Sequence, residues 1–256
     1  MLVTKKFVPS LFTILNAFCG FMSIVNSSNG MYDQACAFIV YAALFDVLDG
    51  LVARILRTSS DFGVELDSLS DAISFGAAPS FLLYSVHFKD YNGYGMVVSS
   101  MIMVFAAIRL ARFNITLVGY EKDKFSGLPT PAAAITIIAY VYFYHNKVFK
   151  PDLSNIFINI ITLGLSLLMV SKFKYPAFPK LTANAVRKNP FPFLLIIIAA
   201  VVSVATKGYA VFFICIAFIL GGIVWSTIMQ VTRKRKREEQ IIAKRAKNGK
   251  KKIISS

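Results

Sequence analysis

The sequence is poor in the residues from which many soluble catalytic and metal sites are built. Its 256 residues include 13 acidic side chains, three cysteines and two histidines. Cys19, Cys36 and Cys215 lie in apolar stretches without the spacing of metal ligands, which argues against disulfides and against a zinc site. His87 and His145 lie in predicted turns, also without partners at ligand spacing, so we expect both at the surface.

No part of the chain has the composition of a soluble domain, and no internal repeat is present. Hydrophobic residues make up 56% of the sequence, and its mean hydropathy is +0.62. Several apolar runs approach the roughly 20 residues that a helix needs to cross a bilayer. The first run has no clear small-residue cleavage site and is followed by further runs, so we expect no cleavable signal peptide. The composition predicts an all-α, multi-pass membrane helical bundle.

The apolar runs predict about eight transmembrane helices. They lie at about 8–25, 34–56, 64–86, 96–117, 130–144, 153–171, 191–206 and 209–231. We divide the chain into a membrane core of six helices (1–171), a basic loop with two further helices (172–231) and a basic tail (232–256). The tail is typical of a segment attracted to anionic lipid, and we do not expect it to bind nucleic acid.

Positive charge is distributed unevenly about the predicted membrane. With eight helices both termini lie on one side, together with the basic loops around residues 54–57, 112–124 and 172–188. The other side carries only Lys89, Lys147, Lys150 and Lys207. The positive-inside rule therefore places both termini in the cytoplasm, with the helices in the cell (cytoplasmic) membrane.

The scarcity of acidic residues makes the stretch from residue 46 to residue 71 stand out. Asp46 and Asp49 lie near the end of the second predicted helix, and Asp67 and Asp71 lie near the start of the third. Since a helix turns about 100° per residue, the two members of each pair share a helical face. The short polar link LRTSSDF reverses the chain, so the two acidic faces can meet near the cytoplasmic side.

Four carboxylates in a membrane are costly unless something neutralises them. One ionised aspartate at mid-membrane costs on the order of 3 kcal/mol, and neighbouring carboxylates also repel one another. Hard divalent cations bind carboxylate oxygens and often share their coordination shell with substrate phosphates. A pair of such ions can organise displacement at phosphorus. The pattern favours such a site, and the alternative is a structural ion cluster that pairs with Arg54 and Arg57.

The spacing of this stretch, D-x2-D-G-x2-A-R-x8-G-x3-D-x3-D, resembles the signature of the CDP-alcohol phosphatidyltransferases at every position. The resemblance covers residues 8 to about 170. It implies a six-helix membrane core, a homodimer, and CDP-diacylglycerol or a close relative as the donor. An acceptor hydroxyl would attack the lipid-side phosphorus, and CMP would leave. One departure is Ser10 after Pro9, where the family often has Asn; Thr13 is retained.

The resemblance also implies roles for individual residues. Two divalent ions, Mg²⁺ or Mn²⁺, would bind Asp46, Asp49, Asp67 and Asp71, and Asp71 would be the general base. Small residues leave the helix surface open to a bulky polar group, and an arginine can hold a phosphate oxygen. The residues expected at the CDP diphosphate are Asp49, Gly50, Ala53, Arg54 and Gly63.

A second, less specific motif concerns the acceptor. RLARFN (109–114) followed by FSGLPTP (125–131) resembles the phosphatidylserine synthase branch, which implies L-serine. Arg109 and Arg112 share a helical face. Either can offer the serine carboxylate a bidentate partner, and Asn114 can add a hydrogen bond.

Three points stay open at this stage. Glycerol 3-phosphate, inositol or inositol phosphate could replace serine, since a phosphate also attracts arginine. A non-enzymatic divalent-cation transporter is a more distant alternative, because an arginine beside the cluster would repel the ion. Thr13 and Asn16, on the first predicted helix, could form hydrogen bonds between helices or contact the substrate.

Overall fold

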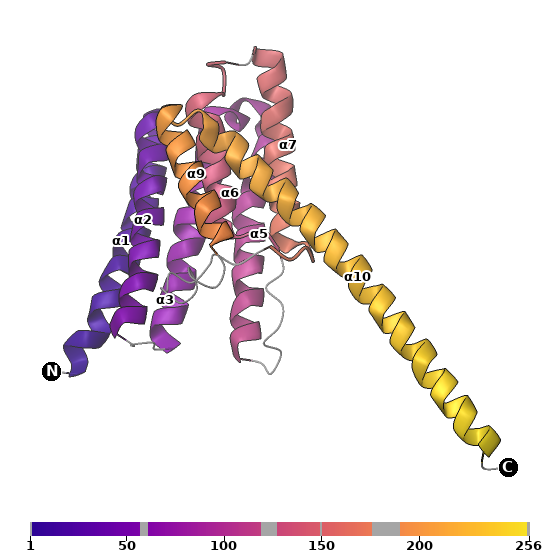
Figure 1. Cartoon of the computed structure of the whole chain (residues 1–256). Helices are drawn as coiled ribbons and strands as arrows, with labels where there is room; N and C mark the ends of the chain where they lie inside the picture. Colours follow the sequence, from indigo (N-terminus) through magenta and orange to yellow (C-terminus); the bar gives the residue numbers. More distant parts are fainter. Residues whose placement is uncertain (1, 57–60, 119–126, 149, 176–189, 255–256) are drawn as a thin grey trace.

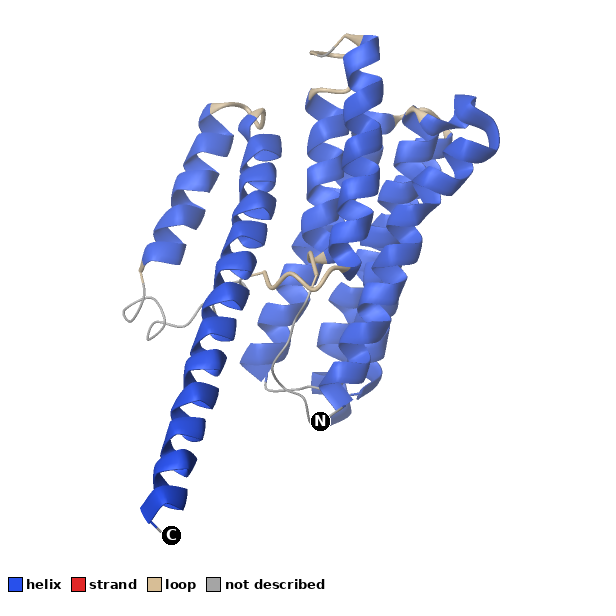
Figure 2. Cartoon of the chain, turned by 90° about the vertical axis from the view of Figure 1, so that its right-hand side faces the viewer, coloured by secondary structure: helices blue, strands red, loops and turns tan. Residues whose placement is uncertain are grey.

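The computed structural model describes residues 2–56, 61–118, 127–148, 150–175 and 190–254, with the backbone alone for 2–10, 116–118 and 233–254. Within these ranges every regular element is helical, as predicted (Figures 1 and 2). Several residues behind the predicted charge asymmetry lie outside the described ranges, namely Arg57, Lys122, Lys124, Lys180, Arg187 and Lys188.

The first three helical rods carry the acidic stretch. α1 (Leu2–Ser28) and α2 (Tyr32–Leu56) are antiparallel neighbours joined by a tight turn at Gly30, which has a φ of 76°. The third rod is continuous in three parts: α3 (Asp61–Asp71), the π-helical segment η1 (Ala72–Ala77) and α4 (Ala78–Val86). π-Helical turns inside a helix often occur at functional sites, and this one begins directly after Asp71.

The remaining elements complete the bundle. After the short η2 (Phe88–Tyr91), the chain forms α5 (Asn92–Val118), α6 (Thr130–Phe143) and α7 (Pro151–Val170). α9 (Phe191–Ala205) and α10 (Ala210–Ile254) follow. The predicted helices agree with these bounds to within a few residues, with two exceptions. α1 begins six residues before the predicted start at residue 8, and α10 runs on through the basic tail as one helix of 45 residues. Figure 1 shows this extension leaving the bundle, with both chain termini at the same end.

Helix length and composition identify a multi-pass membrane protein. Within the described residues, five helical stretches are long and apolar enough to cross a bilayer, and two apolar helices, α6 and α9, are shorter. The five stretches are Leu11–Ser28, Tyr32–Leu56, Phe88–Ile115, Pro151–Val170 and Ala210–Thr232. Their outward faces carry many exposed large apolar side chains, which suits a surface in contact with lipid.

The rod from α3 to α4 and helix α6 lie at the centre of the packing. α1 packs along α2 and against the rod, the rod packs against α5, and α5 packs against α7. α2, α4 and α10 all contact α6. Buried hydroxyls join these helices, because the Oγ of Ser74 donates to Asn16 O at 2.8 Å and the Oγ of Ser80 donates to Ser99 O at 2.6 Å. Such bonds hold helices together where water is absent.

A close approach between α1 and the rod depends on one glycine. Gly20 packs directly on Ser74, and a Cβ at residue 20 would collide with the Ser74 side chain and backbone. Small residues allow membrane helices to approach at this distance. The approach brings the middle of α1 against the segment that follows Asp71.

The expectation that both histidines lie at the surface is wrong. His87 and His145 are 7% and 6% exposed, and their ring centroids are 5.5 Å apart. The Nδ1 of His145 lies 2.8 Å from Ser154 Oγ, which is also 3.0 Å from the hydroxyl of Tyr140. The turns after α4 and α6 fold inward and pack against the first turn of α7, which a local pattern of turn formers does not reveal.

Candidate active site

Carboxylates from two helices converge at the end of the bundle where the chain termini lie. Asp46, on α2, comes together with Asp67 and Asp71, on α3, so that one ligand oxygen of each lies within 4.8 Å of the others. Asp71 is the most deeply buried of the three. The i, i+4 spacing of Asp67 and Asp71 on α3 places both toward α2. Two helices are therefore sufficient to assemble this cluster, as the spacing predicts.

Asp49 is the fourth carboxylate, and α1 holds it. The hydroxyl of Thr13 donates a 2.5 Å hydrogen bond to Asp49 Oδ2. Asp49 Oδ1 is buried and has no hydrogen-bond partner within the described ranges. Asp49 also lies near enough to Asp67 for their charges to repel. One oxygen of Asp49 is thus fixed by protein and the other is left without a partner.

α1 supports the second acidic pair as well. The side-chain amide of Asn16 donates to Asp71 Oδ1 at 3.4 Å. In return, Ser70 Oγ donates to Thr13 O at 3.0 Å, so α1 and α3 are bonded on both sides of Asp71. These contacts favour the first interpretation of Thr13 and Asn16: both form hydrogen bonds between helices, and their partners are members of the acidic cluster.

No described lysine or arginine forms an ion pair with these four carboxylates. Arg54, the nearest arginine in the motif, donates through Nε to Gly50 O at 2.7 Å, one turn earlier on α2. Its side chain is exposed, as is Gly50, while Ala53 and Gly63 are partly exposed. The alternative of a structural ion cluster with Arg54 therefore lacks its ion pair, and Arg57 lies outside the described residues.

The three residues expected at the acceptor do not form one group. Arg109 is partly buried, donates from Nη1 to Thr130 Oγ1 at 3.4 Å, and is near enough to Asp71 for their charges to attract. Arg112 is exposed and donates to Val170 O, at the end of α7, at 2.9 Å. Asn114 accepts from Ser68 Oγ at 3.1 Å. Of the three, Arg109 adjoins the acidic cluster.

Asn114 also bonds to a residue that the sequence analysis did not single out. Its side-chain amide donates to Glu65 Oε2 at 3.3 Å. Glu65 and Ser68 are three residues apart on α3, so Asn114 forms hydrogen bonds with two residues on one face of that helix. The i, i+3 spacing of Glu65 and Ser68 was visible in the sequence. However, nothing in the sequence indicates that this face of α3 packs against α5.

The segment after RLARFN is held against the end of α7. Gly127 has a φ of 98°, where a side chain would be strained and would also strike Met169 O. Its N–H donates to Phe173 O at 2.8 Å, and the N–H of Leu128 donates to Leu168 O at 3.0 Å. RLARFN and the described part of FSGLPTP therefore both contact the end of α7. Phe125 and Ser126 lie outside the described residues.

The residues of the cluster fit a hard divalent cation. They supply only oxygen donors, the class that Mg²⁺ and Mn²⁺ prefer. Two oxygens on opposite sides of one such ion are about 4.2 Å apart, close to the limit of 4.8 Å within which the Asp46, Asp67 and Asp71 oxygens lie. The unpartnered Asp49 Oδ1 offers a further ligand atom. The cluster could therefore bind metal.

Comparison with known proteins agrees with this geometry. Residues 6–173 match the family model described as CDP-alcohol phosphatidyltransferase. A protein of Helicobacter pylori (strain ATCC 700392 / 26695), named CDP-diacylglycerol–serine O-phosphatidyltransferase, is 41% identical over 177 residues, which are 69% of this chain and 74% of the relative.

Two further relatives come from distant organisms. A Bacillus subtilis (strain 168) protein with the same name is 35% identical over 182 residues, covering 70% of this chain and 95% of the relative. A protein of Methanothermobacter thermautotrophicus named archaetidylserine synthase is 41% identical over 173 residues, covering 66% of this chain and 69% of the relative.

Proposed function

The chain belongs to the CDP-alcohol phosphatidyltransferase family, and we propose that it transfers the phosphatidyl group of CDP-diacylglycerol to the hydroxyl of L-serine, releasing CMP. The observation that carries the metal-dependent chemistry is the meeting of Asp46, Asp67 and Asp71, none of which forms an ion pair within the described residues. The choice of serine is supported by the RLARFN and FSGLPTP segments and by the word serine in the names of all three relatives above.

Asp46, Asp49, Asp67 and Asp71 would hold two divalent ions, Mg²⁺ or Mn²⁺. When bound, the ions would neutralise the diphosphate and the charge that develops at phosphorus and on the leaving CMP. Thr13 would keep one oxygen of Asp49 pointed away from the ions, so the other oxygen is the ligand. The carboxylates on two helices would thus form one rigid metal-binding unit.

Asp71 would be the general base. It would accept the proton of the serine hydroxyl while the hydroxyl oxygen forms a bond to the lipid-side phosphorus and the bond from phosphorus to the CMP oxygen breaks. The amide of Asn16 donates to Asp71 Oδ1, which leaves Oδ2 to receive the proton. The chain supplies no histidine next to a nucleophilic serine or cysteine at this end, which favours direct attack without a covalent enzyme intermediate.

The surface beside the carboxylates would receive the donor's diphosphate. Gly50, Ala53 and Gly63 would keep the helix surfaces beside the carboxylates low, and Asp49, next to Gly50 in the chain, would also face the diphosphate. Arg54 is exposed, and among the described residues its one hydrogen bond is from Nε to Gly50 O on its own helix, so its other N–H donors could bind a phosphate oxygen.

Arg109, Arg112 and Asn114 would bind the acceptor, and Arg109 is the best placed. Its buried Nε has no hydrogen-bond partner within the described ranges, and it lies near Asp71. A serine carboxylate at Arg109 would hold the serine hydroxyl near the base. Arg112 and Asn114 would contribute after exchanging part of their present bonds to Val170 O and Ser68.

The remaining parts of the proposal concern organisation. We infer eight membrane-crossing rods, with residues 1–171 as the catalytic core, 172–231 as a loop and two peripheral helices, and 232–256 as a cytoplasmic tail. Both termini and the acidic cluster would face the cytoplasm, where the water-soluble serine and the cytidine head are available. The active form would be a homodimer, as the family resemblance implies.

Release of CMP by the purified protein tests the function directly. With CDP-diacylglycerol and Mg²⁺ or Mn²⁺, we expect release with L-serine and none with glycerol 3-phosphate, inositol or inositol phosphate. Arg109→Lys should raise the KM for serine on the order of tenfold or more, because the bidentate fork is lost, with little change for the lipid donor. Release with a different acceptor would overturn serine, and an equal rise in both KM values would overturn the role of Arg109.

A further inference from the structure

An amphipathic groove lies at the end of the bundle opposite the acidic cluster. One part is a cavity of about 530 Å³ between α2, α6 and the start of α10, lined mostly by apolar side chains such as Ala37, Val40 and Ile138. The adjoining part is a more polar cavity of about 430 Å³. Asp33 and Gln34 line both cavities, so the two parts are continuous along the first turn of α2.

The polar part lies at the level where three helices end. α2 begins at Tyr32, α6 ends at Phe143 and α10 begins at Ala210. Aromatic rings gather at the same level, with ring centroids 4.7 Å apart for Tyr142 and Phe143 and 5.0 Å apart for Phe143 and Tyr209. Aromatic residues are enriched at the level of lipid head groups. We therefore expect the polar part of the groove at head-group level and the apolar part alongside acyl chains.

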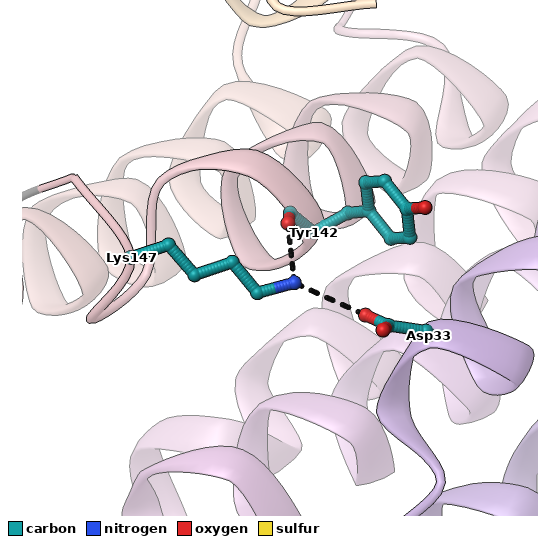
Figure 3. A network of polar contacts seen from close by, with 3 residues as sticks. All are labelled: Asp33, Tyr142 and Lys147. Atoms are coloured by element: carbon teal, nitrogen blue, oxygen red, sulfur yellow. Dashed lines mark hydrogen bonds and ion pairs between the residues drawn. The ribbon is translucent and has the colours of Figure 1, made fainter.

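Lys147 and Asp33, which both line the polar part of the groove, form an ion pair (Figure 3). The Nζ of Lys147 donates to Asp33 Oδ1 at 3.1 Å and to the carbonyl oxygen of Tyr142 at 2.8 Å. An ammonium group has three N–H donors, so one is available to a ligand, as is the second carboxylate oxygen of Asp33. The side chains of Lys147 and Asp33 are 51% and 69% exposed, which leaves both accessible.

We propose that this groove binds a phospholipid whose head group carries a phosphate and a primary ammonium group. Lys147 would donate to the phosphate, Asp33 would accept from the ammonium, and one acyl chain would fill the apolar part beside Ala37. The two free hydrogen-bonding positions match one anion and one N–H cation on the same head group. A choline head has no N–H to donate, and a glycerol head offers only neutral hydroxyl donors, so neither gives Asp33 the hydrogen bond from a cation that an ammonium group gives.

Native mass spectrometry of the full chain in detergent tests this proposal. The delipidated protein is mixed with phosphatidylethanolamine, phosphatidylserine, phosphatidylcholine or phosphatidylglycerol, all with the same acyl chains. We expect the first two to be retained on the order of tenfold better than the last two, as a pair of charge-assisted hydrogen bonds at a partly exposed site would give. Equal retention of all four lipids would overturn the proposal.

Variants separate the two halves of the head group. Asp33→Asn should remove the preference for phosphatidylethanolamine over phosphatidylcholine, and Lys147→Met should weaken retention of all four lipids. Lys89→Met, an exposed lysine at the same end of the bundle, is the matched control and should leave the preference unchanged. If Lys147→Met has a lowered melting temperature, Lys147→Gln replaces it, because an amide can still donate to Tyr142 O. If Lys89→Met loses the preference for phosphatidylethanolamine over phosphatidylcholine as fully as Asp33→Asn does, the assignment of the head-group site to Asp33 and Lys147 is overturned.

A further pair of variants tests the acyl part. Ala37→Phe should fill the groove and abolish retention, whereas Leu44→Phe, on the exposed surface of α2 outside the groove, should not. Displacement of the bound lipid by one equivalent of CDP-diacylglycerol would overturn the proposal by assigning the groove to the donor. If the protein forms a dimer without bound lipid and Ala37→Phe dissociates that dimer, a second copy of the chain occupies the groove. This result would also overturn the proposal.

Discussion

The two ends of the bundle treat their buried polar groups in opposite ways. At the acidic end, Asn16 Oδ1, Asp49 Oδ1 and Arg109 Nε are buried without a hydrogen-bond partner among the described residues. At the other end, His145 bonds to Ser154 and Asn146, and Lys147 pairs with Asp33. His87 Nε2 and Ser27 Oγ, the latter in the last turn of α1, are exceptions there, because both are buried and have no partner within the described part of the chain.

This difference separates a site that needs a ligand from a site that supports the fold. Each buried polar group left unpaired costs about 1–3 kcal/mol, so three of them next to three converging carboxylates are hard to maintain unless metal and substrate complete their bonds. The network at His145 is nearly complete within the protein. We therefore expect substitutions at the acidic end to affect activity and substitutions at the histidine end to affect stability.

The largest expected effect comes from Asp71→Asn. The amide cannot accept the serine proton, and general-base catalysis contributes about 10²–10⁴-fold, so CMP release should fall by about that factor. The melting temperature of the metal-free protein should not fall, because one like charge is removed from the cluster. The measurement is CMP release at saturating serine and CDP-diacylglycerol, together with a melting curve.

Asp152→Asn is the matched control for that substitution. Asp152 is an exposed acidic residue in the first turn of α7, at the opposite end of the bundle. Removing its charge there should cost about 0.3–1 kcal/mol at the helix N-terminus and leave CMP release unchanged. A similar loss of activity in both variants would break the contrast between the two ends.

A smaller loss of activity is expected from Thr13→Val, which keeps the side-chain shape and removes the hydroxyl bonded to Asp49. Groups that orient metal ligands typically contribute about 10–100-fold to metal affinity or activity. The concentration of Mn²⁺ needed for half-maximal rate should rise by about that factor. Ser23→Ala, on the same helix but away from the cluster, should leave this concentration unchanged; an equal rise in both would assign Thr13 a purely structural role.

The sequence was sufficient to predict the acidic cluster because its geometry is local. Asp46, Asp67 and Asp71 meet through helical spacing and a single reversal of the chain, and their cost in a membrane points to a ligand. The helix positions were also predictable, since apolar length decides them. The π-helical segment after Asp71 was not predicted; it packs against α1 and α5, and a local sequence pattern does not reveal such contacts.

The burial of the histidines and the separation of the arginines depend on contacts between distant segments. His145 is buried because α7 brings Ser154 to it, nine residues later in the chain. Arg109 and Arg112 share a face of α5, yet one meets Thr130 and the other meets Val170. The sequence pattern describes a helix face and does not specify the two different partners that this face meets.

Binding of a divalent ion should stabilise the acidic end and leave the histidine end unaffected. An ion at 100 times its Kd contributes about 2.7 kcal/mol, which corresponds to about 5–10 °C in melting temperature for a chain of this size. Melting curves in Mn²⁺ and in EDTA measure the difference. Asp46→Asn should reduce it strongly, and Asp33→Asn should not; an undiminished shift in Asp46→Asn would place the stabilising ion elsewhere.

The smallest expected effect is a pH dependence of stability at the histidine end. Burial, and then the charge of His87, lower the pKa of His145 to about 4 from an ordinary value of 6.5. Burial also lowers the pKa of His87, and Asp90 opposes this shift. Between pH 6.5 and about 4 the unfolded chain binds more protons than the folded chain, so the free energy of unfolding rises with pH in this window. The neutral ring therefore stabilises the fold fully above pH 6.5, and this stabilisation is lost as the pH falls.

His145→Gln tests this linkage, because glutamine can still bond to Ser154 and does not titrate. Melting temperatures at pH 7 and pH 5 should differ by roughly 4–8 °C more in the wild-type protein than in the variant, which corresponds to about 2 kcal/mol. Because the pH difference of the wild-type protein is compared with that of the variant, contributions from the other titratable groups, which the two proteins share, cancel. If the two proteins show the same pH dependence, His145 is not titrating in the unfolding transition. The nearly complete network at this end would then be unrelated to the proton, and the contrast between the two ends would rest on hydrogen bonds alone.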